Sequence, residues 1–233
     1  MLTVVIPWRA QPTRIPALDS VRNWYLDEIG DVYFVFVDSR DEIFNLSQAR
    51  NTGIASITDP DQVVVINDAD TIPQRESLLE AIAAAADSGR VHLPYTRYHW
   101  LGASGSAQQA AGIALDDCDF ELVRGACSGV YVTTRRTWES HGAQDERFRG
   151  WGFEDAAWYL AHSTLLGEPP RRSEGTVFAL HHKAEAREGE HYDANAALME
   201  RYRAAAGHVD AMQALVEESY SDMASNARAL PGA

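Results

Sequence analysis

Two pairs of acidic residues in this chain stand where they could bind a metal ion or move a proton. Asp68 and Asp70 follow the apolar run 62–66 directly. Two carboxylates one residue apart at a strand end can share a hard divalent cation, which prefers oxygen ligands and bridges to phosphate oxygens. Such an ion neutralises charge on a departing diphosphate. The alternative is a solvated acidic turn, and the buried strand before the pair, with Ile72-Pro73 after it, favours the metal site.

The second pair, Glu154 and Asp155, follows a glycine-rich aromatic segment. Gly150 and Gly152 flank Trp151 and permit a backbone in which the indole lies flat against a ligand, and aromatic rings suit the apolar faces of sugars. The two acids open a predicted helix, whose positive end favours ionised carboxylates. The alternative is that the acids only satisfy this helix end while Trp151 is a core residue. The presence of both acidic pairs in one chain favours a ligand site.

The composition is that of one globular domain. The chain has 233 residues, 45% hydrophobic and 23% charged, and no apolar run approaches the roughly 20 residues that span a bilayer. Residues 1–7 have no basic region and are too short for a secretory signal, so we interpret them as a first strand and expect a cytoplasmic protein without a membrane span.

The charge balance excludes one large class of partner. The chain carries 20 Lys and Arg against 34 Asp and Glu, a net charge of −14, and we therefore expect no nucleic acid partner. A metal ion and a few arginines can still hold a nucleotide diphosphate locally. Cys118 and Cys127 lack the spacing of metal ligands, and we expect reduced thiols, with Cys127 buried.

Strands and helices alternate along the first part of the chain. Strands are predicted over 3–7, 32–37, 62–66 and 91–95, and helices over 16–29, over 46–57 with an Asn45 cap, and from near Pro73 to Gly89. This order predicts a parallel sheet covered by helices on both faces, and the continuous apolar run 32–37 predicts a strand buried on both sides. Ligands bind such sheets outside the carboxyl ends of the strands, where Asp38, Asp68 and Asp70 fall.

The second part of the chain is less regular. Residues 102–119 are rich in small side chains and predict a loop, in which 116–119 could be a second metal site but is better read as a solvated turn. Further elements are predicted as strands over 129–133 and 176–180, helices over 135–141 and 154–166, and one or two helices over 191–228. We expect a main domain over 1–185 and a C-terminal helical extension over 186–233.

Several motifs occur in an order that matches a known group of enzymes. They are Ile6-Pro7-Trp8-Arg9, Phe44-Asn45 leading to Ala49-Arg50-Asn51-Thr52-Gly53, Asn67-Asp68-Ala69-Asp70, and Asp145-Glu146-Arg147-Phe148-Arg149-Gly150-Trp151-Gly152-Phe153-Glu154-Asp155. Over residues 3–182 the chain resembles GT-A-fold glycosyltransferases and is similar to the β-1,4-galactosyltransferase and related family 2-like group. The resemblance implies an α/β fold with a central, mainly parallel mixed sheet flanked by helices.

The resemblance also implies an activity and a metal. It implies transfer of a hexose from a nucleotide-sugar, UDP-linked, to a hydroxyl of a glycan, protein or small-molecule acceptor, with inversion. Asp70 would bind the metal directly, and Asp68 would contact the ribose or a metal-bound water. His181 or His182 would supply a further ligand, and we choose His181. Because a neutral imidazole suits Mn²⁺ better than Mg²⁺, we expect manganese, with magnesium as the alternative.

Further roles follow from the same resemblance. In the nucleotide pocket, Asp38 would accept a hydrogen bond from the base, and Pro7, Trp8 and Arg9 would form the wall. Arg50 would contact a phosphate, or else form a salt bridge on the helix surface. Asp155 would be the general base, with Glu154, Trp151 and Gly152 placing acceptor and donor sugar. The group often has further acids after this pair, whereas here Ala156-Ala157 follow.

Alternatives remain open at this stage. The stretch 95–100, Tyr-Thr-Arg-Tyr-His-Trp, could line an acceptor groove or be a half-buried strand. A sugar nucleotidyltransferase would need a glycine-rich basic loop after the first strand, and residues 8–12 do not form one. A non-catalytic module that binds a carbohydrate or a nucleotide is the third reading.

Overall fold

The computed structural model describes residues 1–183 and 188–229, with side chains described as far as residue 220. A six-stranded sheet of order β2-β1-β3-β8-β5-β9 lies at its centre, beside a four-stranded sheet of order β4-β10-β6-β7. The strands of the central sheet are β1 (Leu2–Pro7), β2 (Val32–Val37), β3 (Val63–Asn67), β5 (His92–Leu93), β8 (Val130–Thr134) and β9 (Arg171–Arg172). Those of the second sheet are β4 (Thr71–Pro73), β6 (Arg97–Trp100), β7 (Glu121–Leu122) and β10 (Thr176–Ala179).

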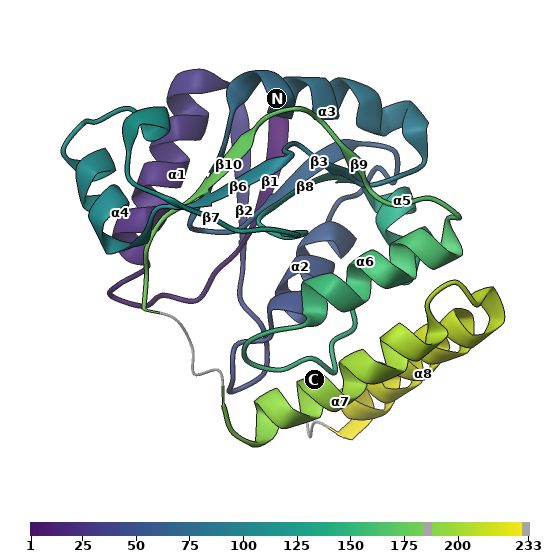
Figure 1. The fold of residues 1–233 in the computed structure, drawn as a ribbon. Helices are drawn as coiled ribbons and strands as arrows, with labels where there is room; N and C mark the ends of the chain where they lie inside the picture. The colour runs from purple at the N-terminus through teal and green to yellow at the C-terminus, as the bar shows by residue number, and fades with distance from the viewer. Residues whose placement is uncertain (184–187, 230–233) are drawn as a thin grey trace.

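Helices cover both faces of the central sheet, as predicted. The α-helices of the described residues are α1 (Ile15–Glu28), α2 (Leu46–Ala55), α3 (Arg75–Ser88), α4 (Gly102–Ala110), α5 (Arg135–Ser140), α6 (Glu154–Leu165), α7 (Glu190–Ala205) and α8 (Val209–Ala229). Figure 1 shows α1 and α3 on one side of the sheet and α2 and α6 on the other, with α7 and α8 beyond α6.

The central sheet is mixed and mainly parallel, which confirms the expected fold class. β1 pairs in parallel with β2 and β3, whereas β8 runs antiparallel to β3 and β5. Because β1, β2 and β3 are parallel, their carboxyl ends reach the same edge of the sheet. Asp38 and Asp68 follow two of these ends, so the sheet brings the nucleotide-binding candidates and the first acidic pair to one edge.

The predicted burial of residues 32–37 on both faces is wrong. β2 is an edge strand, with the side chain of Tyr33 56% exposed and that of Phe36 44% exposed. The Arg22 guanidinium lies 5.9 Å from the centre of the Phe36 ring, so part of this apolar face is covered by a cation rather than by a helix core. An apolar run reports burial only when strands lie on both sides of it.

The loop predicted over 102–119 is also wrong, because residues 102–110 form α4. Gly105 packs so closely on residue 119 that an added Cβ would lie 2.0 Å from the Asp119 carbonyl oxygen. Ser104 and Gln108 donate hydrogen bonds to the Asp119 carboxylate at 2.9 and 3.0 Å. The small residues therefore allow a close helix contact, and the Asp119 carboxylate holds it through Ser104 and Gln108.

The C-terminal helices share a second core with α6. Phe148, Ala161, Met199, Tyr202 and Met212 form its centre, apart from the main core of the sheet. The expected boundary at residues 185 and 186 lies outside the described residues, so the division into domain and extension stays a prediction. None of the helices described here is both long and apolar enough to cross a bilayer.

Three buried histidines near α5 and α6 predict acid sensitivity. Burial lowers the pKa of His92 and His162 to about 4 and that of His141 well below its usual value. In the unfolded chain these histidines have a pKa of about 6.5. Between about pH 6.5 and 4 they therefore bind more protons in the unfolded chain than in the folded chain, and the free energy of unfolding falls as pH falls. We expect a loss of roughly 3 kcal/mol for each of His92 and His162 by pH 4.

Urea unfolding at pH 7, 6, 5 and 4 measures this loss. The His141→Phe variant keeps the ring contacts with Trp138 and Trp158 and should show a shallower pH dependence, whereas replacement of the exposed His208 by Gln should leave it unchanged. Equal stability at pH 7 and pH 5 in the wild type would contradict the prediction.

Candidate active site

A buried arginine joins the two acidic pairs that the sequence separates. Arg50 lies on α2 with its side chain 0% exposed, and its Nη2 atom donates to the Asp68 carboxylate oxygens at 2.6 and 2.8 Å. Its Nη1 atom lies 3.9 Å from the Glu154 carboxylate at the start of α6. The salt bridge expected on a helix surface is therefore an internal one, and Arg50 holds acids from two distant segments rather than presenting its charge to solvent.

The electrostatics of this group follow from burial. The pKa of Glu154 is raised to about 7, chiefly by burial and then by the neighbouring Asp155, and Arg50 opposes this rise. Burial also raises the pKa of Asp68, while Arg50 lowers it. Arg50 therefore favours the ionised form of both carboxylates against the effect of burial.

Asp70 is brought to a histidine by the second sheet. β4 and β10 pair antiparallel, and the Leu180 backbone N–H donates to the Asp70 carbonyl at 2.7 Å. The histidine in contact is His182, whose Nε2 atom lies 2.9 Å from the Asp70 carboxylate. This hydrogen bond is the main reason that the pKa of His182 is raised.

This geometry favours His182 over His181, the residue chosen from the sequence. The His181 side chain is exposed and lies near Trp100, with ring centres 6.4 Å apart, and its backbone N–H donates to Ser106. Successive residues leave an extended segment on opposite sides, so a shift of one residue moves the imidazole away from Asp70.

The residues present fit a hard divalent ion in part. Asp70 and His182 offer one oxygen and one nitrogen donor at a common point, a set that suits Mn²⁺. Both oxygens of Asp68 already accept from Arg50, so Asp68 is not placed as a direct ligand. Among the side chains that the structure describes, no three of His, Cys, Asp or Glu form a metal-binding group. Phosphate oxygens and water would have to supply the remaining ligands.

Asp155 stands in the first turn of α6, next to Glu154. Its Oδ1 atom accepts from the Ala156 backbone N–H at 2.8 Å. Burial, followed by Asp155, raises the pKa of the Cys127 thiol, which is buried and reduced as expected. Burial raises the pKa of Tyr98 well above its usual value, and Asp70, Asp68 and Asp155 all add to this rise. The three carboxylates therefore lie within electrostatic reach of one phenol.

Arg9 organises the loop that follows β2. Its Nε atom donates to the Asp38 carboxylate at 2.8 Å, and its other nitrogens donate to the carbonyls of Ser39, Asp41 and Glu42 at 2.7 to 2.9 Å. Asp38 remains 52% exposed in this pair. Pro7 ends β1, and Trp8 packs on the core directly after it. The four nucleotide-pocket candidates thus lie together at the carboxyl ends of β1 and β2.

The Trp151 loop is held by a helix that sequence reasoning did not connect to it. Trp151 is 36% exposed, which rules out the core reading, and its ring stacks on Tyr192 of α7 with centres 6.2 Å apart. Gly152 has φ +102°, which favours glycine, and Phe153 follows at φ 76°. The buried Asn195 side chain donates to the carbonyls of Arg149, Trp151 and Gly152 at 2.9 to 3.4 Å.

No local signal identifies Tyr192 or Asn195 as part of the site. They lie about forty residues after the loop, on a helix whose pattern predicts only packing. A polar side chain on a buried helix face is the one hint, because such a group needs partners.

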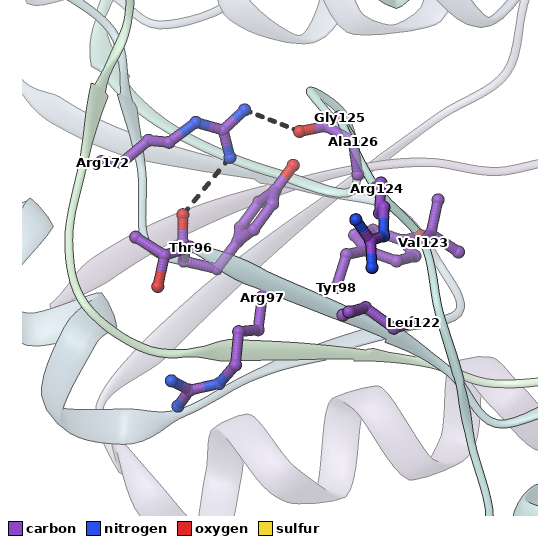
Figure 2. A pocket seen from close by; sticks show the side chains of 10 residues that line it. Thr96, Arg97, Tyr98, Leu122, Val123, Arg124, Gly125, Ala126 and Arg172 are labelled. Atoms are coloured by element: carbon purple, nitrogen blue, oxygen red, sulfur yellow. Dashed lines mark hydrogen bonds between the residues drawn. The ribbon is translucent and has the colours of Figure 1, made fainter.

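A cavity of about 380 Å³ lies beside Tyr98. It is lined by Tyr95, Thr96, Arg97, Tyr98, Leu122, Val123, Arg124, Gly125, Ala126 and Arg172. Figure 2 shows Arg172 and Arg124 on opposite sides of this cavity and Arg97 below them. Four residues of the stretch 95–100 therefore line a cavity, while residues 97–100 also form the half-buried strand β6, so both alternatives for that stretch stay open.

Comparison with known proteins supports the fold and little more. No protein-family model matches the chain, and no curated protein matches it in sequence. Two structures of Drosophila β-1,4-galactosyltransferase 7 superpose with a TM-score of 0.57 at 14% identity. The first is a mutant with manganese, UDP-Gal and xylobiose, and the match covers 81% of the present chain and 76% of the galactosyltransferase chain. The second is the catalytic domain with xylobiose, and the match covers 87% of the present chain and 79% of the galactosyltransferase chain.

The chain has a GT-A fold. A third GT-A structure, GalNAc-T7 with UDP, GalNAc and Mn²⁺, matches 94% of this chain and 55% of its own with a TM-score of 0.50 at 11% identity. In this GT-A chain, the acids that the sequence singles out lie at the carboxyl edge of the central sheet or beside it. At these identities the likeness shows the fold alone, so the roles of the residues are proposals.

Proposed function

We propose that this protein is a metal-dependent glycosyltransferase that moves a hexose from a UDP-sugar to a hydroxyl acceptor with inversion. The observation that supports this most is the contact of the Asp70 carboxylate with His182 Nε2 at 2.9 Å, on a GT-A fold. The superposed galactosyltransferase 7 was solved with manganese and UDP-Gal, and GalNAc-T7 with Mn²⁺, UDP and GalNAc, which supports the general kind of activity.

Asp70 and His182 would hold Mn²⁺ in this proposal. The ion, when bound, neutralises charge on the diphosphate as it departs. Asp38 accepts from the base, and Pro7, Trp8 and Arg9 form the wall of the nucleotide pocket. Arg50 positions Asp68 and Glu154 rather than contacting phosphate, because its guanidinium is enclosed between them.

Asp155 acts as the general base. The acceptor hydroxyl oxygen forms a bond to the anomeric carbon while the bond from that carbon to the diphosphate oxygen breaks, and UDP leaves with the electron pair. Asp155 takes the hydroxyl proton. Trp151 supplies a flat surface for a sugar, and its ring is held against Tyr192 of α7.

Replacement of His182 tests the metal site against its neighbour. His182→Ala should weaken Mn²⁺ binding by at least about 10-fold, since replacing even a residue that only supports a metal ligand lowers metal affinity by that factor. The measurements are Mn²⁺-stimulated donor hydrolysis and Mn²⁺ affinity in the presence of UDP. His181→Ala is the matched control and should behave as wild type. Asp70→Asn should reproduce the loss in His182→Ala.

Two results would count against the proposal. Mn²⁺ binding that is equal in the wild type and in the Asp70 and His182 variants would remove the metal site. UDP binding without metal-stimulated turnover across neutral, acidic and peptide-linked acceptors would favour a non-catalytic module, and release of pyrophosphate from a nucleoside triphosphate and a sugar phosphate would favour a nucleotidyltransferase.

A further inference from the structure

The cavity beside Tyr98 is positively charged in a protein of strongly negative charge. The chain has a net charge of −14, yet three arginines and no acidic residue line this cavity. The segments that carry the arginines are β6 for Arg97, the turn before Gly125 for Arg124, and β9 for Arg172. Three like charges, brought together from three segments with no acidic residue in the lining, indicate a site for an anion.

The three arginines are not paired with carboxylates among the described residues. Arg172 donates to the carbonyls of Ala126 and Tyr95 at 2.6 and 3.4 Å, and its guanidinium lies 5.2 Å from the Tyr95 ring centre. Arg97 donates through Nε to the Thr176 hydroxyl at 3.1 Å, which leaves its two terminal nitrogens for a ligand. Most other arginines described here have a carboxylate within 4 Å, as Arg9, Arg90 and Arg136 do.

A structural role explains Arg172 but not Arg124. Arg172 donates to the carbonyls of Ala126 and Tyr95, and so joins residue 126 to the segment that follows β5 (Figure 2). These hydrogen bonds fix one wall of the cavity. Arg124 is exposed at a turn that continues into Gly125 at φ +72°, and the structure gives its side chain no hydrogen bond to any described residue. A guanidinium presents five donors in a plane that suits carboxylate, sulfate or phosphate groups.

The cavity lies beside the acidic end of β3. Tyr98 lines the cavity, and a Cβ added to Gly129 would lie 3.2 Å from the Tyr98 ring. The Gly129 carbonyl in turn accepts from the Asp68 backbone N–H at 2.8 Å. The half-buried Tyr98 ring gives the cavity an apolar wall, and it meets the buried Tyr95 ring edge to face with centres 5.8 Å apart. An aromatic wall with cationic rims is the surface that an acidic sugar needs.

We propose that this cavity binds the acceptor and selects one that carries an anionic group, that is, an acidic saccharide with a carboxylate, sulfate or phosphate. This inference rests on the proposed glycosyltransferase function. Arg124 and Arg97 recognise the anion, Arg172 shapes the wall, and the acceptor hydroxyl extends from the cavity toward Asp155.

Binding of three matched disaccharides by calorimetry tests the inference. The probes share one linkage and end in a uronic acid, a sulfated sugar or a neutral sugar, and each is titrated with and without UDP and Mn²⁺. The wild type should bind at least one of the two acidic probes about 10-fold more tightly than the neutral one, and the double variant Arg97→Gln, Arg124→Gln should lose this preference. The uronate and sulfate arms identify which anion is preferred.

Arg171→Gln is the control, because Arg171 is exposed on the same strand as Arg172 and does not line the cavity. Equal binding of all three probes by the wild type, or a preference that survives in the double variant, overturns the inference. Loss of UDP–Mn²⁺ affinity in the double variant also overturns it, since the arginines would then serve the donor diphosphate. Absence of UDP–Mn²⁺ binding in the wild type instead counts against the proposed function, and the titrations without donor separate the two failures.

Discussion

Asp155→Asn is expected to lower the turnover of sugar transfer by about 10²–10⁴-fold while UDP and Mn²⁺ affinity stay at the wild-type value. The amide keeps the shape of the side chain and its hydrogen bond from the Ala156 N–H, but it cannot take a proton from the acceptor hydroxyl. Single-turnover rates with a saturating donor measure the chemical step directly. A variant that transfers sugar at the wild-type rate would remove Asp155 from the role of base.

Glu154→Gln separates the two adjacent acids. Glu154 is turned toward Arg50 and has a pKa raised to about 7, whereas Asp155 is close to Cys127 and the cavity wall. The Glu154 variant should therefore lose stability through its weakened contact with Arg50 and keep more turnover than the Asp155 variant. The reverse order of turnover would assign proton transfer to Glu154.

Arg50→Leu is expected to lower the free energy of unfolding by about 3–5 kcal/mol, since it leaves buried carboxylates without a counterion. Asp68 and Glu154 would then each have to take up a proton or draw in water to remain in place. Denaturation in urea at pH 7 and at pH 5 measures the effect, which should be smaller at pH 5, where protonation removes part of the uncompensated charge.

Arg136→Leu is the matched control for that loss. Its bidentate contact with Asp61 has similar distances, 2.6 and 2.8 Å, but both side chains are more than 60% exposed. Ion pairs in water contribute little, so this variant should unfold close to the wild type. A wild-type stability for Arg50→Leu would contradict the view that Arg50 joins the acidic pairs.

The local parts of the fold and site could be predicted from sequence. The strand over 32–37 has its predicted bounds, the Asn45 side chain accepts from the Gln48 N–H as the capping pattern indicates, and Gly89 ends α3 in the left-handed conformation. Asp68, Asp70, Glu154 and Asp155 could be found because each pair follows a clear element boundary. These features depend on neighbours within a few residues.

The parts that depend on distant neighbours could not be predicted. Whether Arg50 is exposed depends on Asp68 and Glu154, which come to it from β3 and α6. The choice between His181 and His182 depends on the pairing of β10 with β4, which no local pattern fixes. The sequence of α4 does not predict a helix, because its small residues favour one only when the backbone of Asp119 packs against Gly105.

The stacking of Tyr192 on Trp151, with Asn195 beneath three loop carbonyls, ties the tail of the protein to its chemistry. A chain shortened before α7 would lose the Tyr192 and Asn195 contacts that orient the indole, even with Asp68, Asp70, Glu154 and Asp155 intact. Under the proposed function, substitutions in α7 change sugar preference through the orientation of Trp151, at residues that need not touch the ligand.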